Sequence, residues 1–370
     1  MTGKRDPMKT SAICNSEKIH PAACKPSLVL ASVEELTSFI KSRGESAYRA
    51  KQIYDWTAKK FVSDPGDMTN LSAGIKELLR AEYSCGNVVL DREESAPDGS
   101  RKLLLRLEDD ETIECAILGA LDGRTTFCLS TQVGCPVRCA FCASGAGGLV
   151  RNLTAGEIVE QYLLCCRQIG KAPDNVVIMG IGEPMLNLDN LILALETICN
   201  PEGIALAARR VTISTSGWTP GIKALAEHGR QWNLAVSLHG GDDKTRALLI
   251  PGRFRRDIKE IVEACRKHKE ATGRLLTFEY VLLAQINDSV EQATKLARIA
   301  KDANAKVNLI PYNKANGAFE RPSREVIKKF ENTLKMLQVP VTVRVEKGFD
   351  SSAACGQLRS SASSGRKKNS

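Results

Sequence analysis

Three cysteines, Cys135, Cys139 and Cys142, lie close together in the middle of the chain at CxxxCxxC spacing. Thiolates spaced this closely can bind one metal centre. A closed zinc site takes four protein ligands, and a closed iron–sulfur cluster normally takes four cysteines. Only three are grouped here and no histidine lies near them, which favours a 4Fe-4S cluster with one iron open to a non-protein ligand. A zinc site with a distant fourth ligand is the alternative.

A second set of polar residues falls at the ends of strands predicted further along the chain. Gly182 and Glu183 belong to a Gly-Glu-Pro turn, in which glycine admits a ligand close to the backbone and the carboxylate suits an ammonium group. The later strand ends offer hydroxyl, imidazole, amide and backbone groups suited to a ribose or a carboxylate. They are Ser214, Ser237, Leu238, His239 and Asn313.

Two further cysteines lie where a cluster does not need them. Cys355 follows the last predicted strand, and Cys128 precedes the first clustered cysteine by seven residues. The chain has 13 cysteines in all, and stable disulfides are rare in a reducing compartment. Several others fall in helical patterns, where cysteine is more often a small core residue than a ligand. These are Cys165, Cys166, Cys199 and Cys265.

Alternating strand and helix patterns must position these residues. Strands are predicted at 125–130, 175–179, 210–215, 233–238, 275–282, 306–310 and 339–345, and helices at 156–169, 188–199, 257–271, 289–301 and 323–337. Such repetition predicts an α/β fold with a parallel sheet and right-handed crossovers. About six units could close into a partial (β/α)6 barrel, with its site at the carboxyl ends of the strands. The candidate residues fall at those ends.

The rest of the chain divides into smaller segments. A capping box at Ser32 and Glu35 begins a run of three short helices, followed by strands at 88–90, 102–107 and 112–118. We predict a disordered tail at 1–30, a helical accessory domain at 31–85, a strand-rich bridge at 86–120, the main domain at 121–358 and a disordered basic tail at 359–370.

The composition limits the class of protein. The net charge is +9, from 52 Lys and Arg against 43 Asp and Glu, which suits a polyanionic partner. No run of about 18 apolar residues could span a membrane, and the N-terminus lacks the apolar core of a signal peptide. We therefore expect a cytoplasmic protein that does not bind membranes.

These motifs resemble those of a known family. The CxxxCxxC spacing resembles the signature of the radical S-adenosylmethionine superfamily, in which three cysteines hold a 4Fe-4S cluster and the open iron chelates S-adenosylmethionine. From about residue 48 to 358 the chain resembles the RlmN/Cfr family of radical S-adenosylmethionine RNA methyltransferases. The similar segments are 49–56 (RAKQIYDW), 68–72 (MTNLS), 131–135 (TQVGC), 151–154 (RNLT), the Gly-Glu-Pro turn and 353–358 (AACGQL).

The resemblance implies roles for individual residues. Cys355 would accept a methyl group from one S-adenosylmethionine, and a second would give the 5′-deoxyadenosyl radical that activates this methyl group for addition to carbon 2 of adenine. Cys128 would then form a transient disulfide with Cys355 and free the product. Glu114 would be the proton acceptor. The cofactor-binding residues would be Gly182, Glu183, Ser214, Ser237, Leu238, His239 and Asn313.

The resemblance also implies partners. The substrates would be 23S rRNA and tRNA, with the helical domain at 31–85 binding RNA and the target adenine turned out of its stack. Flavodoxin or ferredoxin would supply electrons, and we expect a monomer.

Two alternatives stay open. A Cfr-like enzyme would methylate carbon 8 with the same machinery, and a basic RNA-binding protein with a structural zinc site would have no such activity.

The chain departs from the family pattern at 251–255 (PGRFR) and 347–351 (KGFDS), and the loop between Glu114 and Cys128 is one residue longer.

Overall fold

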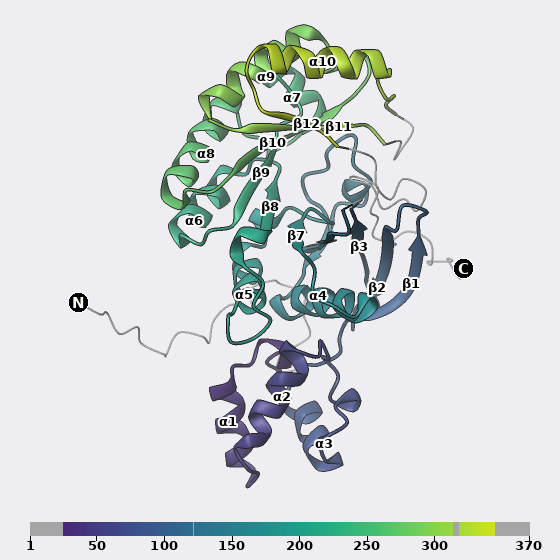
Figure 1. The fold of residues 1–370 in the computed structure, drawn as a ribbon, viewed down its shortest axis with the longest axis vertical. Coiled ribbons are helices and arrows are strands. Elements are labelled where there is room, and N and C mark those ends of the chain that lie inside the picture. The colour runs from purple at the N-terminus through teal and green to yellow at the C-terminus, as the bar shows by residue number, and fades with distance from the viewer. Residues whose placement is uncertain (1–24, 121, 314–317, 345–370) are drawn as a thin grey trace, which may run out of the picture.

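The computed structural model describes residues 25–120, 122–313 and 318–344. At the N-terminal end, α1 (Val33–Ser42), α2 (Tyr48–Ala58) and α3 (Ala73–Glu82) form a small lobe below the main sheet (Figure 1). The predicted capping box is present, with the hydroxyl of Ser32 accepting the N–H of Glu35. The lobe has its own core, which includes Leu36, Ile53 and Met68.

The last residues of the predicted tail at 1–30 are structured. Leu28–Leu30 forms a 3-10 helix in which Leu28 is fully buried. The backbone N–H of Leu28 donates to the carbonyl of Ser84 at 2.9 Å. Leu28 packs in the core of the helical lobe, whereas Val29 packs in the core of the main sheet. Contacts distant in sequence therefore order a segment that has no strong local signal.

One ten-stranded sheet organises the rest of the chain. Three antiparallel strands, β1 (Val89–Ser95), β2 (Arg101–Arg106) and β3 (Thr112–Gly119), pair onto β4 (Thr125–Cys128). The strands that follow are parallel to β4 and lie in chain order. They are β7 (Asn175–Ile178), β8 (Val211–Thr215), β9 (Asn233–Ser237), β10 (Leu276–Leu282), β11 (Lys306–Pro311) and β12 (Val341–Val343).

The crossover helices lie along the outer face of this sheet (Figure 1). They are α4 (Ala155–Ile169), α5 (Leu188–Ile198), α6 (Thr219–His228), α7 (Asp243–Leu249), α8 (Ile258–Thr272), α9 (Val290–Asp302) and α10 (Arg324–Met336). The fold is the predicted α/β partial barrel with a small N-terminal helical region. The structure adds α6 and α7, together with a hairpin of β5 (Gln132–Gly134) and β6 (Leu149–Asn152), which the sequence patterns did not indicate.

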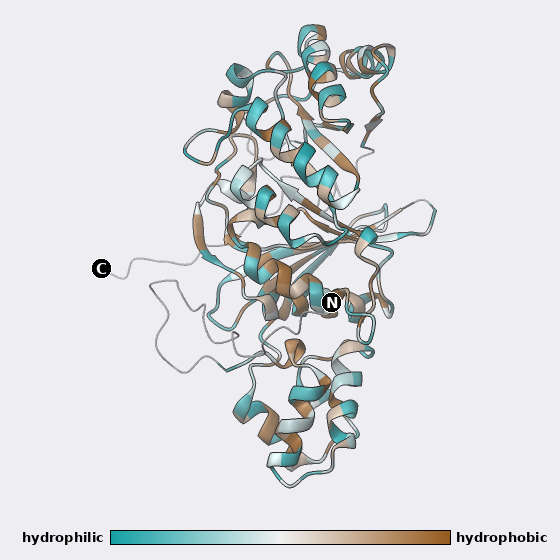
Figure 2. Cartoon of the chain, turned by 90° about the vertical axis from the view of Figure 1, so that its left-hand side faces the viewer, coloured by the Kyte–Doolittle hydropathy of each residue, from teal (hydrophilic) through white to brown (hydrophobic). Residues whose placement is uncertain are grey.

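The main core lies between the sheet and the helices. Figure 2 shows the strands as largely hydrophobic and the helices as banded with hydrophilic residues. Cys165, Cys166 and Cys265 are buried in helices, as predicted for small core residues. Within the described residues, no helix is both long and apolar enough to cross a membrane.

Candidate active site

The loop that carries the three cysteines is closed at its base by the β5–β6 hairpin. Cys135 follows β5, and its N–H donates to the carbonyl of Gly148 at 2.8 Å. Gly134, with φ +75°, must be glycine, because a Cβ there would lie 1.9 Å from the Gly148 oxygen. Further along the loop, Ala140 donates to the carbonyl of Leu249 at 2.9 Å. These contacts hold the thiols on one wall of a cavity.

That cavity opens at the carboxyl ends of β7 to β10 and brings together most of the predicted site. Its lining includes all three clustered cysteines, the Gly-Glu-Pro turn and polar residues from the next strand ends. The predicted residues among them are Cys135, Cys139, Cys142, Gly182, Glu183, Ser214, Ser237 and His239. Residues far apart in the chain therefore lie together at the carboxyl ends of the parallel strands.

Two predicted residues, Leu238 and Asn313, do not line this cavity. Leu238 is fully buried, and its N–H pairs with the carbonyl of Glu279. Asn313 is buried beyond β11, and its Oδ1 has no hydrogen-bond partner within the described part of the chain. A buried amide oxygen without a partner is costly in free energy. Asn313 therefore keeps a polar atom available for a ligand.

Burial controls the protonation of two of the clustered thiols, Cys135 and Cys139. It raises the pKa of Cys135 to about 12. Burial, together with the neighbouring thiols, also raises the pKa of Cys139 well above its usual value. Such thiols stay protonated at neutral pH until a cation displaces their protons, so metal binding releases protons here.

The donor chemistry fits an iron–sulfur cluster. Across residues 25–120, 122–313 and 318–344, no three His, Cys, Asp or Glu side chains converge on one point suited to a single metal ion. A cubane cluster binds each thiolate through a different iron, so its ligands need only line one cavity. Three soft thiolates on the wall of one cavity meet that requirement.

Glu183 places a buried carboxylate beside the cysteines. Its side chain is 2% exposed and accepts the N–H of Ser216 at 2.7 Å and that of Met185 at 3.1 Å. Burial raises its pKa, against the effect of these hydrogen bonds. Gly182 adopts φ +116°, and a Cβ there would come within 2.8 Å of Thr131 and Gln132. The turn thus fixes an acidic group that suits a cationic ligand.

We expect Glu183→Gln to raise the Kd for S-adenosylmethionine by about 10- to 100-fold, the effect of losing one charge-assisted hydrogen bond. The amide can still accept one backbone N–H, so the fold should persist. The measurement is S-adenosylmethionine binding at equilibrium. Glu196→Gln, on the outer helix α5, is the matched control. Equal affinities of Glu183→Gln and the unaltered protein would exclude this role for the carboxylate.

His239 is a neutral, fixed imidazole at the cavity wall. Burial, together with the charge of Arg246, lowers its pKa to about 3. Its Nδ1 accepts the N–H of Val281 at 3.1 Å, and Phe141 packs edge-on against the ring. An imidazole that accepts at Nδ1 carries its proton on Nε2. His239 can therefore donate a hydrogen bond but does not act as a cation at neutral pH.

Arg246 is a site residue that the sequence analysis missed. It lies on α7 and is fully buried. Its guanidinium donates to the carbonyls of Ser237 at 2.8 Å and Leu238 at 2.7 Å, and also to that of Ser216. Burial lowers its pKa to about 10, and its charge favours the thiolate form of Cys139. It links the ends of β8 and β9 beneath the cavity, and no local sequence pattern signals that contact.

Cys128 and Glu114 lie on one face of the sheet beside this cavity. The register pairs Ala116 with Cys128 and places Glu114 two residues from Ala116, so all three side chains share a face. Cys128 packs in a cluster with Met179, which also lines the cavity. Glu114 is buried, with Lys102 Nζ 3.3 Å from its carboxylate. Cys355 and the segment 347–351 lie outside the described residues.

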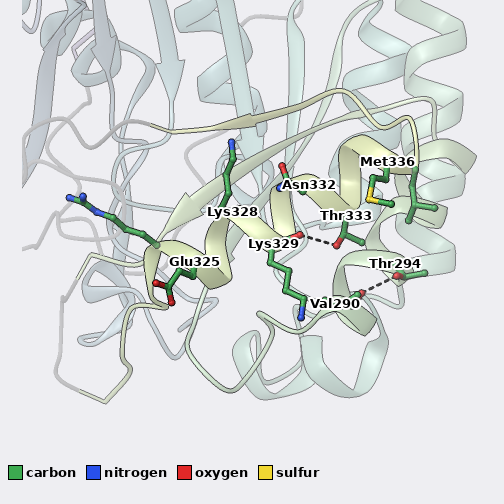
Figure 3. A pocket seen from close by; sticks show the side chains of 10 residues that line it. Val290, Thr294, Glu325, Lys328, Lys329, Asn332, Thr333 and Met336 are labelled. Carbon is green, nitrogen blue, oxygen red and sulfur yellow. Dashed lines mark hydrogen bonds between the residues drawn. The ribbon is translucent and has the colours of Figure 1, made fainter.

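A second hollow lies on the outer side of the barrel, between α9 and α10. Figure 3 shows its lining, which combines lysines with apolar side chains such as Val290 and Met336. None of the predicted site residues line it. The candidate site is therefore the cavity at the strand ends.

Comparison with known proteins gives two family matches. Residues 129–297 match the Radical SAM superfamily, and residues 28–84 match the ribosomal RNA large subunit methyltransferase N-terminal domain. The first match includes the cysteine loop and most of the cavity. The second includes α1, α2 and α3.

Curated relatives match along most of the chain. A probable dual-specificity RNA methyltransferase RlmN of Akkermansia muciniphila is 40% identical over 90% of this chain and 95% of its own length. One from a Thermotoga species is 44% identical over 89% and 96%. Among solved structures, a radical SAM methyltransferase from Sphaerobacter thermophilus is 40% identical, covers 90% of this chain and 99% of its own, and has a TM-score of 0.85.

Proposed function

Because this chain belongs to the RlmN family of radical S-adenosylmethionine, dual-specificity RNA methyltransferases, we propose that it methylates carbon 2 of an adenine in 23S rRNA and tRNA. The observation that carries the proposal is the shared cavity of the three cysteines and Glu183. The RlmN names of the relatives favour carbon 2 over the carbon 8 expected of a Cfr-like enzyme. A zinc-containing RNA-binding protein would leave the buried carboxylate of Glu183 without a role.

The cavity residues hold the cofactors. Cys135, Cys139 and Cys142 bind a 4Fe-4S cluster, which supplies the electron that cleaves S-adenosylmethionine. Glu183 and the backbone at Gly182 bind the ammonium group of that molecule. The remaining polar positions bind its carboxylate, ribose and base; they are Ser214, Ser237, Leu238, His239 and Asn313. Each turnover uses two equivalents of S-adenosylmethionine, one as methyl donor and one as radical source.

Two cysteines carry the methyl group and release the product. The Cys355 thiolate attacks the methyl carbon of one S-adenosylmethionine and becomes S-methylcysteine. After that carbon has bonded to adenine and the ring proton has been removed, the Cys128 thiolate attacks the sulfur of Cys355 and a Cys128–Cys355 disulfide forms. The electron pair of the broken sulfur–carbon bond passes to the carbon, which takes a proton and becomes the methyl group. The packing of Cys128 against Met179 beside the cavity supports its role as the disulfide partner. Thiol reduction restores both cysteines.

Glu114 is the base that removes the ring proton. It is buried on the same face as Cys128, and its backbone carbonyl accepts the hydroxyl of Ser130 at 2.6 Å. The Lys102 ammonium lies 3.3 Å from the Glu114 carboxylate and holds that group in place. Lys102 also pairs with Glu94 at 2.9 Å, which fixes its position. Lys102 is thus a positioning residue.

We expect Lys102→Met to slow single-turnover methylation by about 10-fold, the effect of losing one charge-assisted contact that holds the Glu114 carboxylate in place. Lys102→Arg keeps the charge and should keep most of the rate. The measurement is single-turnover methylation at saturating RNA and S-adenosylmethionine, with iron content as the check on folding. Equal rates for the Met variant and the unaltered enzyme would contradict this role.

The helical lobe and external partners complete the proposal. Residues 31–85 form an RNA-binding accessory domain, in which Lys60 stacks on Trp56 at 3.7 Å and Arg49 on the exposed ring of Tyr48 at 4.8 Å. Rings and cations of this kind bind unpaired RNA. Flavodoxin or ferredoxin supplies electrons, and the enzyme acts as a monomer.

Nucleoside analysis tests the proposed function. 23S rRNA and tRNA that lack the modification would be incubated anaerobically with reconstituted enzyme, S-adenosylmethionine and a reductant, then digested and analysed by mass spectrometry against standards. We expect 2-methyladenosine from both RNAs. 8-Methyladenosine would identify the Cfr-like alternative, and bound zinc with no iron and no methylation would identify the RNA-binding one.

A further inference from the structure

A cluster of arginines and aromatic rings joins Trp218 to the segment 251–256, whose first five residues, 251–255, depart from the family pattern. Arg256 stacks on Trp218 at 4.0 Å, and Arg253 stacks on Phe254 at 4.9 Å. Trp218 and Phe254 pack edge to face with their centroids 5.6 Å apart. With Arg255, the segment carries three positive charges within four residues.

Both ends of the segment are tied to the candidate active site. The carbonyl of Leu249, just before it, accepts the N–H of Ala140, which lies between Cys139 and Cys142. At the other end, the carbonyl of Arg256 accepts Nε of Arg246 at 3.3 Å, and Arg246 lies beneath the cavity. Trp218 follows Ser216, which lines the cavity, by two residues. The cluster therefore lies beside the entrance to the site.

The charges of this cluster are held in place but remain accessible. Arg256 donates to the carbonyls of Arg253 at 3.0 Å and Arg255 at 2.9 Å, which stiffens the loop. Its acidic neighbour Glu260 is 3.9 Å away. Arg253 is exposed and Arg255 half-buried, and neither forms an ion pair within the described part of the chain. Two guanidinium groups are thus left for an external anion.

We propose that this arginine–aromatic loop binds phosphates of the substrate RNA next to the target adenine. The inference rests on the proposed function, because it needs an RNA substrate at this cavity. Guanidinium groups bind phosphate through two parallel hydrogen bonds. A loop fixed before binding loses little entropy on doing so. Arg253 and Phe254 both lie in the stretch 251–255.

The test is RNA binding by Arg253→Gln/Arg255→Gln, measured by filter binding with an in vitro transcript of the methylated region. Each lost phosphate contact lowers the slope of log affinity against log salt by about 0.7 to 0.9. We expect the slope to fall by about 1.4 to 1.8 and the KM for RNA to rise. S-adenosylmethionine cleavage with dithionite, without RNA, should stay unchanged because neither arginine lines the cavity.

Arg266→Gln/Lys267→Gln is the matched control, since it removes the same charge from exposed positions on α8. Iron content and thermal unfolding verify that both variants fold. A slope for the loop variant equal to that of the control would overturn the proposal. Normal RNA binding combined with slower reduction of the enzyme by flavodoxin would also overturn it. That result would indicate that the loop binds the electron-donor protein. RNA binding is measured separately from methylation. If the proposed activity is wrong, the unaltered enzyme will fail to methylate RNA; if only the loop proposal is wrong, the unaltered enzyme will methylate RNA and the loop variant will bind RNA as the control does.

Discussion

Cys355→Ala is expected to produce no methylated adenosine in either RNA, while retaining its iron–sulfur cluster. Cys355 is the only methyl carrier in the proposed reaction, so its removal stops transfer before any bond to adenine forms. The three clustered cysteines, which are the proposed cluster ligands, line one cavity, and Cys355 is not among those ligands. The measurement pairs nucleoside mass spectrometry with iron and sulfide analysis of the same anaerobic sample.

The control for this prediction is Cys85→Ala, which removes a half-buried thiol in the segment after α3. It should methylate RNA at the rate of the unaltered enzyme. We also expect Cys355→Ala to form 5′-deoxyadenosine slowly, because cleavage of S-adenosylmethionine needs only the cavity. Methylation by Cys355→Ala at a normal rate would refute the S-methylcysteine route and leave the cavity assignment intact.

Cys139→Ala is expected to lose the cluster and, with it, all cleavage of S-adenosylmethionine. Cys139 is the middle one of the three proposed ligands, and two thiolates cannot hold a cubane whose fourth iron is already open to an external ligand. The raised pKa of the Cys139 thiol, caused mainly by burial, means that the apoprotein carries it protonated. Removing it should therefore cost the fold little. Iron content, the visible absorption band and 5′-deoxyadenosine are the measurements.

Cys265→Ala is the matched control for the cluster variant. Its thiol is fully buried in α8 and lies outside the cavity, with a pKa raised to about 12 by burial alone. It should keep iron, colour and activity. A Cys139→Ala protein that still bound four irons and cleaved S-adenosylmethionine would contradict the ligand assignment. Loss of iron in both variants would indicate a general folding defect.

The parts of the fold that sequence predicted are those with strong local signals. The capping box at Ser32 begins a helix where expected, because its hydrogen bonds span only three residues. The helix predicted at 156–169 likewise begins at a capping box, at Thr154. The parallel strands were recognised from their apolar runs and lie within a few residues of prediction. The helix α6 was missed because Pro220 and Gly221 lower helix propensity in its first turn, although proline is favoured there. The seven-residue α7 is too short for a periodic signal.

The parts of the site that sequence could not supply depend on contacts across the sheet. Arg246 reaches the carbonyls of Ser216 and Ser237 from a helix that sequence did not indicate. The shared face of Glu114 and Cys128 follows from the register of β3 on β4. A shift of one residue would turn Glu114 to the opposite face. Leu28 was assigned to a tail because no local pattern signals its tertiary contacts, such as the hydrogen bond from its N–H to the carbonyl of Ser84.

Formation of 5′-deoxyadenosine by the reconstituted enzyme tests the central claim most directly. The protein would be loaded with iron and sulfide under anaerobic conditions, then given S-adenosylmethionine, dithionite and unmodified RNA. We expect 5′-deoxyadenosine in at least the amount of methylated adenosine formed, and none from Cys139→Ala. Methylated RNA without 5′-deoxyadenosine, or a fully loaded cluster that never cleaves S-adenosylmethionine, would contradict this claim.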